Sequence, residues 1–315
     1  TSKLIGNKLI RLYINNVTIN EGTVNTWDTE TGEGLTAWTP IGTMEVPFAG
    51  TFDGQGHTIS GVYLNTSSHT AGLFAAQSGT VSNFYLKNSY FNSTYTNSKV
   101  NATTGAYLGS VVGVNKGTVS KVYSDAIVNS VHAQVGGIVG RTVNASSIRE
   151  CWFDGEVNLT TTNGKLSGGV VGYAYVESGK TDVVFDITDC LFTGTITTPA
   201  SSGASSAWGI GVGGILGQSY GPAAVTYTID IENCVSAGTI DLTYTSGDAD
   251  GGGVILGGIE AANTQVTLTN VYGTNECCAK ATRPYYLMSG VEASITGEGT
   301  MIVESDLHGI KGYKN

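Results

Sequence analysis

Two aspartates occupy the same place in two similar stretches of the sequence, Asp186 in DITDC and Asp230 in DIENC. If these stretches stack as neighbouring strands, the carboxylates lie about 5 Å apart, which raises one pKa or attracts a cation. That spacing also suits a retaining glycosidase, with Arg149 in the earlier stretch SIREC as the basic partner. The alternative interpretation is a solvated acidic face.

Other catalytic patterns are weak. GQSYG, around Ser219, matches the GxSxG pattern of serine hydrolases, but that turn needs a strand that enters a helix. Pro222 and a β-rich segment follow instead, so we interpret the match as accidental. The histidines are scattered and form no HExxH motif: His57, His69, His132 and His308.

The cysteines are odd in number, so at least one is unpaired. Cys151, Cys190 and Cys234 recur at equivalent positions, which favours buried apolar thiols in a row. A cysteine metal site is the alternative, although a row does not match the tetrahedron that zinc prefers. Cys277 and Cys278 receive no assignment.

A calcium site is a second metal hypothesis. In DADGGG, Asp248 and Asp250 are separated by one residue and resemble part of a calcium loop. The other ligands of such a loop are missing, so a glycine-rich turn with two solvated acids is favoured. We expect no cofactor.

Aromatic residues are concentrated in the insertion from Tyr85 to Tyr107. Flat rings among hydroxyl and amide groups suit contact with sugar or protein. The alternative is that some of these rings cover the core beneath a long loop. The ligand-binding candidates are Tyr90, Phe91, Tyr95 and Tyr107.

The elements that would position these residues follow from a repeat. A glycine-bracketed apolar phrase recurs (SVVG, GGIVG, GGVVG, GGILG, GVILG), and it ends at Gly113, Gly140, Gly172, Gly217 and Gly257. The stretch between successive closing glycines is too short to bury a core of its own, so the repeated units must stack on one another. With 45 glycines, few charged residues and β-type alternation, the chain is predicted to be an all-β, single-stranded, right-handed parallel β-helix with loop insertions.

Stacking predicts ladders of like side chains along the axis. One ladder contains the apolar residues before the closing glycines. Two more follow from the second phrase of each unit: Val81, Val119, Ile148, Ile187, Ile231, Leu268; and Phe84, Val122, Cys151, Cys190, Cys234, Val271. The polar position between them, from Asn83 to Asn270, is predicted to be the corner where the strand bends.

Charge and hydropathy narrow the partners. The net charge of −10 opposes nucleic-acid binding, because that affinity comes mostly from neutralised phosphates. No apolar run approaches the length needed to span a bilayer, so we expect no transmembrane segment. Six asparagines stand in glycosylation-type triplets, about as many as chance gives, and whether they are used stays open: Asn16, Asn65, Asn92, Asn101, Asn144 and Asn158.

The repeated phrase resembles the GLUG motif of bacterial surface proteins. WTPIGT, from Trp38, and FAGTFDGQGHTISGVYL, from Phe48, resemble the segment that precedes GLUG repeats in secreted proteins, including the N-terminal regions of IgA-specific metallopeptidases. The resemblance spans roughly residues 36 to 308. It implies a β-helix at the bacterial surface or outside the cell, and no peptidase motif accompanies it.

We therefore predict one β-helix domain over 1–315, with N-terminal coils in 1–70, repeats in 71–275 and a C-terminal coil and cap in 276–315. The predicted function is a non-enzymatic, adhesin-like or structural module that binds a host glycan or an extracellular protein through its loops. One alternative is a β-helix polysaccharide lyase or glycoside hydrolase. The other is a filament subunit that self-associates through exposed strand edges.

Overall fold

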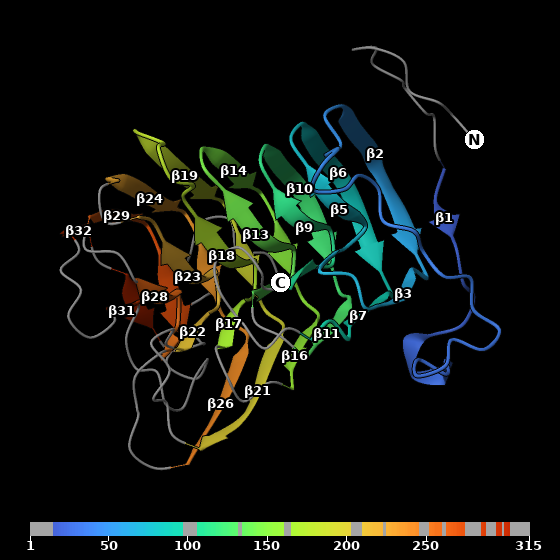
Figure 1. Ribbon diagram of the computed structural model, residues 1–315. Coiled ribbons are helices and arrows are strands. Elements are labelled where there is room, and N and C mark those ends of the chain that lie inside the picture. The colour runs from blue at the N-terminus through green and yellow to red at the C-terminus, as the bar shows by residue number, and fades with distance from the viewer. Residues whose placement is uncertain are drawn as a thin grey trace.

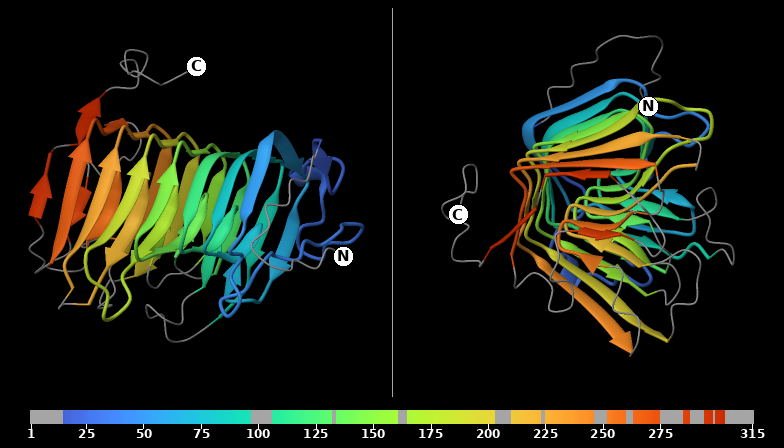
Figure 2. Two further views of the ribbon diagram at one scale, coloured as in Figure 1. Left: turned by 90° about the horizontal axis from the view of Figure 1, so that it is seen from above. Right: turned by 90° about the vertical axis from the view of Figure 1, so that its left-hand side faces the viewer.

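The computed structural model describes residues 15–96, 106–131, 134–160, 165–202, 210–222, 225–245, 252–259, 263–274, 285–287, 294–297 and 299–302. In this part of the chain almost all regular structure is β-strand, with one short 3-10 turn, η1 (Val24–Thr26). The strands run side by side along one elongated column, from blue at the N-terminal end to red at the other (Figures 1 and 2). The predicted all-β, parallel β-helical fold is confirmed; its right hand stays a prediction.

The described strands form four parallel sheets, named A to D. Sheet A is the widest and contains β1 (Val17–Thr18), β2 (Thr51–Ser60), β6 (Thr80–Lys87), β10 (Thr118–Ser124), β14 (Ser146–Arg149), β15 (Trp152–Phe153), β19 (Val183–Thr188), β20 (Leu191–Phe192), β24 (Tyr227–Glu232), β25 (Val235–Ser236), β29 (Thr264–Thr269), β30 (Tyr272–Thr274), β32 (Ser294–Thr296) and β33 (Thr300–Ile302).

After sheet A, each coil continues through sheets B, D and C in that order. Sheet B contains β3 (Tyr63–Thr66), β7 (Tyr90–Ser93), β11 (Ile127–Ser130), β16 (Glu156–Leu159), β21 (Thr195–Ser202) and β26 (Thr239–Thr245). Sheet D contains β4 (Thr70–Ala71), β8 (Tyr107–Gly109), β12 (Val135–Gly136), β17 (Lys165–Gly168), β22 (Ile210–Gly213) and β27 (Gly252–Gly253). Sheet C contains β5 (Phe74–Gln77), β9 (Val112–Asn115), β13 (Val139–Val143), β18 (Val171–Tyr175), β23 (Leu216–Tyr220), β28 (Leu256–Ile259) and β31 (Tyr285–Leu287).

The predicted ladders are present in the strand register. Ile148 pairs with Val119 on one side and with Ile187 on the other, and Ile187 pairs in turn with Ile231. All of these side chains are fully buried. Because each rung covers the next, one apolar core runs through the whole described stack and holds the sheets in register.

The predicted strand corner is also confirmed. Every residue at the polar position between the two inner ladders has a left-handed backbone, with φ between 51° and 62°. Asn233 donates to Asp189, and Asn270 donates to Asn233, so their side chains continue the ladder outside the core. The corner residues are Asn83, Lys121, Glu150, Asp189, Asn233 and Asn270.

The repeated glycines have a steric cause. They flank the tight bend between sheets D and C, where neighbouring coils approach closely. A Cβ on Gly136 would lie 2.0 Å from the Val139 carbonyl oxygen, and one on Gly140 would lie 2.6 Å from the Leu108 nitrogen. Since only a residue without a Cβ fits there, the glycine-bracketed phrase is a requirement of the bend.

The N-terminal end of the stack is covered by a segment of irregular structure. Ala37, Ile41 and Phe48 each form an isolated bridge to the first complete coil, at Tyr63, Phe74 and Gln77 respectively. Trp38, Ile41 and Phe48 pack against the core. This segment covers apolar surface at one end of the column. None of the described helices is long and apolar enough to cross a membrane.

Candidate functional site

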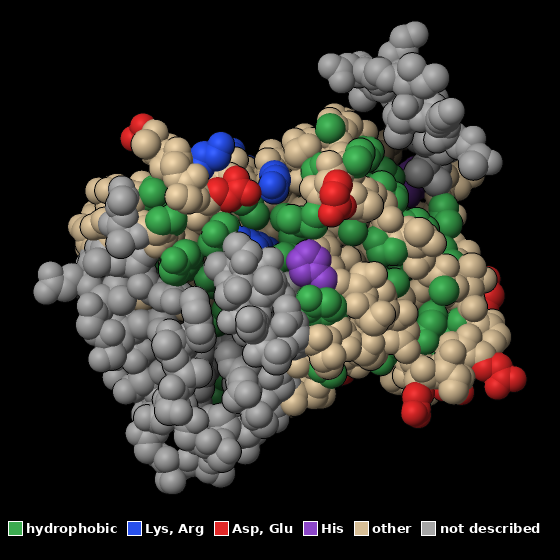
Figure 3. All heavy atoms as spheres, viewed as in Figure 1, with side chains coloured by type: hydrophobic (Ala, Val, Ile, Leu, Met, Phe, Trp, Pro, Cys, Tyr) green, Lys and Arg blue, Asp and Glu red, His purple; other side chains and the backbone are tan. Residues whose placement is uncertain are grey.

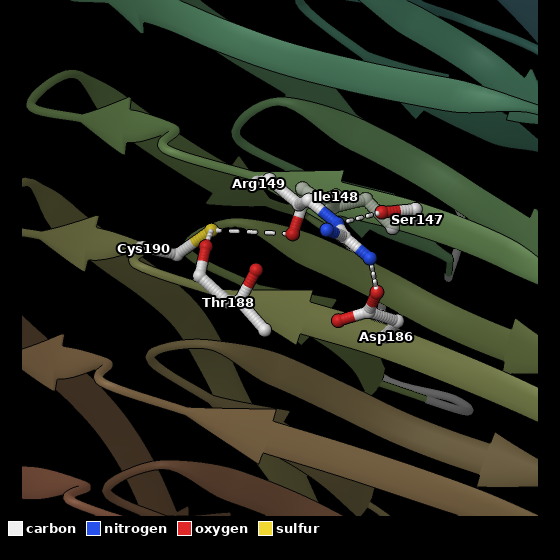
Figure 4. Close-up of polar contacts among 6 residues, drawn as sticks. All are labelled: Ser147, Ile148, Arg149, Asp186, Thr188 and Cys190. Atoms are coloured by element: carbon white, nitrogen blue, oxygen red, sulfur yellow. Dashed lines mark hydrogen bonds and ion pairs between the residues drawn. The ribbon is translucent and has the colours of Figure 1, made fainter.

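Sheet A places the three residues of the predicted acidic site together. Asp186 in β19 and Asp230 in β24 are paired across neighbouring strands. Arg149 in β14 lies one coil earlier and forms an ion pair with Asp186 (Figure 4). The Arg149 Nε also donates to the Ser147 hydroxyl at 2.7 Å, which holds the guanidinium along the sheet. The register predicted for the acids is therefore correct.

The two aspartates differ in their surroundings. Partial burial, and then the negative charge of Asp186, raise the pKa of Asp230. Asp186 has the Arg149 guanidinium, whereas no basic side chain among the described residues forms an ion pair with Asp230. The two carboxyl groups thus differ in their surroundings, although both lie on the open surface of the same sheet.

The candidates in the aromatic insertion require a correction. Phe91 and Tyr107 are buried in the structure, and Tyr90 is 8% exposed. The segment is not one long loop: it contains β7 and leads into β8, so alternate side chains face the core. Tyr90 stacks on Tyr63, with ring centroids 6.0 Å apart, and Tyr95 lies against His69. Tyr90, Phe91 and Tyr107 therefore consolidate the coil, whereas Tyr95 is half-buried and its role in ligand binding stays a prediction.

The remaining sequence candidates are structural or lie outside the described residues. Ser219 is buried in β23 and lies 3.3 Å from the Tyr227 hydroxyl, so the GxSxG match is accidental. The row of cysteines is buried and unpaired, and burial raises the pKa of Cys151 and Cys190, which makes these thiols inert. Asp248, Asp250, Cys277 and Cys278 lie outside the described residues.

Metal binding finds no support in the described residues. No group of three or more metal-ligating side chains gathers in that part of the chain.

Asparagines from three of the glycosylation-type triplets form part of a ladder on sheet B: Asn92 donates to Asn65, and Asn158 donates to Asn129.

A second site on sheet A was not predicted. Tyr85, Tyr123 and Trp152 lie next to one another on the outer surface of three successive coils, tilted or edge-on to each other, and we call them the outer aromatic patch. Tyr85 is 46% exposed and Trp152 is 38% exposed, although both are large rings. The ring centroids are 6.0 Å apart for Tyr85 and Tyr123, and 4.9 Å apart for Tyr123 and Trp152. The result is a continuous aromatic surface along the axis.

Hydrogen bonds fix the orientation of this patch. The Trp152 Nε1 donates to the Thr193 hydroxyl at 2.7 Å, and that hydroxyl donates to Asp154 at 2.6 Å. The Tyr123 hydroxyl lies 3.4 Å from the other oxygen of Asp154. One carboxylate therefore receives hydrogen bonds from two sides, which reduces the rotamer freedom of the indole before any ligand binds.

Charges border the patch on one side. The Lys87 ammonium lies 5.7 Å from the ring centre of Tyr85 and 5.4 Å from that of Tyr123. Burial raises the pKa of Asp125, and burial together with the charges of Asp125 and Asp154 raises the pKa of Tyr123. Tyr123 therefore remains a neutral hydroxyl, able to donate a hydrogen bond at neutral pH.

A cavity of about 270 Å³ adjoins the same carboxylates. Its wall includes Asp125 and Asp154, which directly follow β10 and β15 of sheet A, Glu156 from β16 and the segment around η1. A cavity of this volume is small for an organic ligand and suits one polar group at the end of a longer molecule. Its lining residues are Thr23, Val24, Asn25, Asn88, Ser89, Asp125, Ile127, Asp154, Gly155 and Glu156.

The patch does have a signal in the sequence. In FYLK, VYSD and CWFD, the first residue belongs to the third inner ladder, an aromatic residue directly follows it, and a charged residue stands two positions after the aromatic one. In the later units CLFT and CVSA, the position after the ladder residue is not aromatic. Aligning the outward positions of the repeat, as well as the buried ones, identifies the patch.

The fold is similar to that of a solved structure, described as a "putative immunoglobulin A1 protease" from Bacteroides ovatus. The TM-score is 0.52 and the identity is 19%, over 89% of this chain and 77% of that chain. No family model matches the sequence, and no curated protein matches it. At this identity the likeness supports the fold alone, and membership of the GLUG-repeat proteins stays a prediction.

Proposed function

We propose that this chain is a non-catalytic β-helix module of an exported bacterial protein, and that it binds glycans through the outer aromatic patch. The observation that carries the proposal is one continuous row of rings in which Tyr85 and Trp152 are exposed and Tyr123, between them, is half-buried. Burying such rings in the core would stabilise the fold, so leaving them at the surface suggests that they contact a partner.

The composition of the patch fits a sugar better than an apolar partner. Aromatic faces contact the apolar faces of sugar rings, while Lys87, Asp154 and the Tyr123 hydroxyl offer hydrogen bonds to sugar hydroxyls at the edges. Successive rings 5 to 6 Å apart form a strip, which suits an extended oligosaccharide. The adjoining cavity would accept a substituent of one sugar unit.

Export and surface location form part of the same proposal. The repeat resembles the GLUG motif, and a structure of similar fold is described as an immunoglobulin A1 protease of a bacterium. Neither observation supplies a catalytic group to this chain. A scaffold that presents a binding strip is therefore the function that fits both the sequence resemblance and the described side chains.

A glycan array tests the proposal. The wild-type chain is expected to bind a restricted set of oligosaccharides, and the double variant Tyr85→Ala/Trp152→Ala is expected to lose that set. Val184→Ala is the matched control, because Val184 is also an exposed apolar residue of sheet A (43%) but lies outside the patch. Equal array profiles for the wild type and the double variant would refute the assignment.

A carbohydrate-active enzyme is the second candidate, and the asymmetric pair of Asp186 and Asp230 favours it. In this reading Asp230, with its raised pKa, is the general acid and Asp186 the carboxylate that stabilises positive charge. Release of reducing sugar from polysaccharides, abolished in Asp230→Asn, would establish it. Absence of turnover across a broad polysaccharide panel would leave binding without catalysis.

A further inference from the structure

The outer side of the bend between sheets D and C contains a second group of buried side chains, separate from the main core. Tyr107 belongs to one small apolar cluster with Val114, and Leu166 belongs to another with Tyr173. They come from β8 and β9, which contact each other, and from β17 and β18, which also contact each other. We call this region the outer corner. Figure 3, which views the molecule from the same side as Figure 1, shows mainly uncharged side chains with few charged ones between them.

Arg141 is the charged residue of this corner. It is 5% exposed, and its guanidinium carbon lies 4.7 Å from the ring centre of Tyr107 and 3.8 Å from that of Tyr175. It forms no ion pair with a carboxylate of the described residues, and its Nε has no hydrogen-bond partner there. After burial, the charge of Arg141 is the next cause that lowers the pKa of His69.

Gln134 faces the same corner. It directly precedes β12, and its backbone forms hydrogen bonds with Leu166 and Leu108, while Arg141 pairs with Val114 and Tyr173 in sheet C. Tyr107 and Val114 share one cluster in the coil before, and Leu166 and Tyr173 share another in the coil after. Gln134 and Arg141 occupy the corresponding positions of the coil between them. Gln134 is 1% exposed, and its Oε1 has no partner among the described residues.

Two buried polar groups in one coil are thus left incomplete. The tyrosine rings attract the faces of the guanidinium, but its N–H groups point outward in the guanidinium plane and need acceptors. A buried, unpaired charge is strongly unfavourable, whereas a carboxylate or sulfate accepts two N–H bonds of arginine at once. The amide of Gln134 presents either its oxygen or its NH₂ by a flip, so it can add a third donor.

We propose that the outer corner is a binding site for an oxyanion of carboxylate or sulfate type. Arg141, whose guanidinium contacts the rings of Tyr107 and Tyr175, and Gln134 hold the oxyanion. Free inorganic anions and acidic or sulfated sugars share this chemistry. The site is distinct from the outer aromatic patch, which lies on sheet A, so it stands or falls independently of the proposed glycan binding.

Calorimetric titration with sodium sulfate and with sodium glucuronate, at constant ionic strength in chloride, tests the site. The wild type is expected to bind at least one of them saturably, and Arg141→Met is expected to bind it at least about tenfold more weakly. Arg149→Met is the matched control, since Arg149 is 53% exposed and already paired with Asp186. It should bind like the wild type.

The two ligands also separate the sources of the anion. Binding of both supports a site for a free oxyanion, and binding of glucuronate alone supports an acidic sugar. Glucose, which lacks the carboxylate, should bind neither to the wild type nor to Arg141→Met at this site. Absence of saturable binding of sulfate and glucuronate to the wild type, or equal binding by Arg141→Met, would overturn the proposal.

A second variant supplies the anion within the chain. Gln134→Glu places a carboxylate opposite Arg141, so it should raise the melting temperature and remove the response to added sulfate or glucuronate. If the Gln134 amide alone were an adequate partner for Arg141, Gln134→Glu would give no such gain in melting temperature. A Gln134→Glu protein that is less stable and still binds the anions as the wild type does would count against the site.

Discussion

The outer surface of sheet A carries two different groups of side chains on the same framework. In the earlier coils, three neighbouring rings are bordered by Lys87, and Asp154 orients two of them, Tyr123 directly and Trp152 through Thr193. In the later coils, Asp186 and Asp230 face each other, and Arg149 compensates only one of them. The first group is fixed in place before any ligand arrives, whereas the second contains unrelieved repulsion. The proposal of glycan binding therefore rests on the first group.

The comparison also separates two roles within each strand. The inward residues repeat because each one must cover the rung below it, as the aliphatic side chains around Ile187 show. The outward residues are free of that requirement and vary from coil to coil. Chemistry specific to this protein is thus expected on outward rungs, and stability on inward rungs.

Substitution of an inward rung should have the largest effect. Ile187→Ala leaves a cavity in a fully buried ladder and is expected to lower the free energy of unfolding by about 2–5 kcal/mol. The outward neighbour Thr188 is the control, and Thr188→Ala should change the free energy of unfolding by less than about 0.5 kcal/mol. Urea denaturation of both variants measures the contrast; equal losses would mean that the two faces do not differ in this way.

The hydrogen bonds of the patch should give a smaller loss. Thr193→Val removes the acceptor of the Trp152 Nε1 and one donor to Asp154, so stability should fall by about 0.5–1.5 kcal/mol. The indole should also become more mobile, which lowers the anisotropy of its fluorescence. Unchanged anisotropy in Thr193→Val would show that packing on Tyr123, and not this bond, orients the ring.

The ion pair of the acidic group is exposed and should contribute less. Arg149→Gln is expected to lower the free energy of unfolding by less than about 1 kcal/mol, because solvent screens a surface pair. The loss should shrink in an Asp230→Asn background, because Arg149 then no longer offsets the negative charge of Asp230. A double-mutant cycle of Arg149→Gln and Asp230→Asn measures the coupling between these two residues, and a coupling energy of zero would mean that Arg149 does not act on Asp230.

The pH dependence of Asp230 is the smallest predicted effect. Its pKa is raised in the folded state, so the folded protein holds the proton more tightly than the unfolded chain does. Stability is then lost as the pH rises from below the ordinary aspartate pKa through the raised value. Asp230→Asn removes this loss, so its advantage over the wild type should be larger at pH 7 than at pH 3. A stability advantage of Asp230→Asn that does not change with pH would contradict a raised pKa of Asp230 in the folded protein.

The sequence predicted the inward half of this structure well. Equivalent residues such as Val119, Ile148 and Ile187 repeat because stacking demands it, and the left-handed corner follows from the polar residues between the ladders. The pairing of Asp186 with Asp230 followed from the same alignment. These features depend on register alone, which a repeat reveals.

Burial across a bend was not predictable in the same way. The rings of Phe91 and Tyr107 were expected on a loop. Instead, Phe91 lies in β7 and is buried in the main core, and Tyr107 lies in β8 and is buried in the outer corner. The outer aromatic patch was missed because the combination of an aromatic residue with a charged residue two positions later recurs in only three units, too few to stand out as a repeat. Outward positions carry little periodic signal, so their surroundings depend on the three-dimensional stack.

The affinity of Trp152→Ala for the oligosaccharide that the wild type binds best is the most direct measure of the central claim. Calorimetric titration should show binding weakened by at least about tenfold, because the variant loses the stacking ring at one end of the strip. Val184→Ala, on the same sheet, should retain wild-type affinity. If Trp152→Ala binds as tightly as the wild type, or if Val184→Ala loses as much affinity, the outer aromatic patch is not the binding surface.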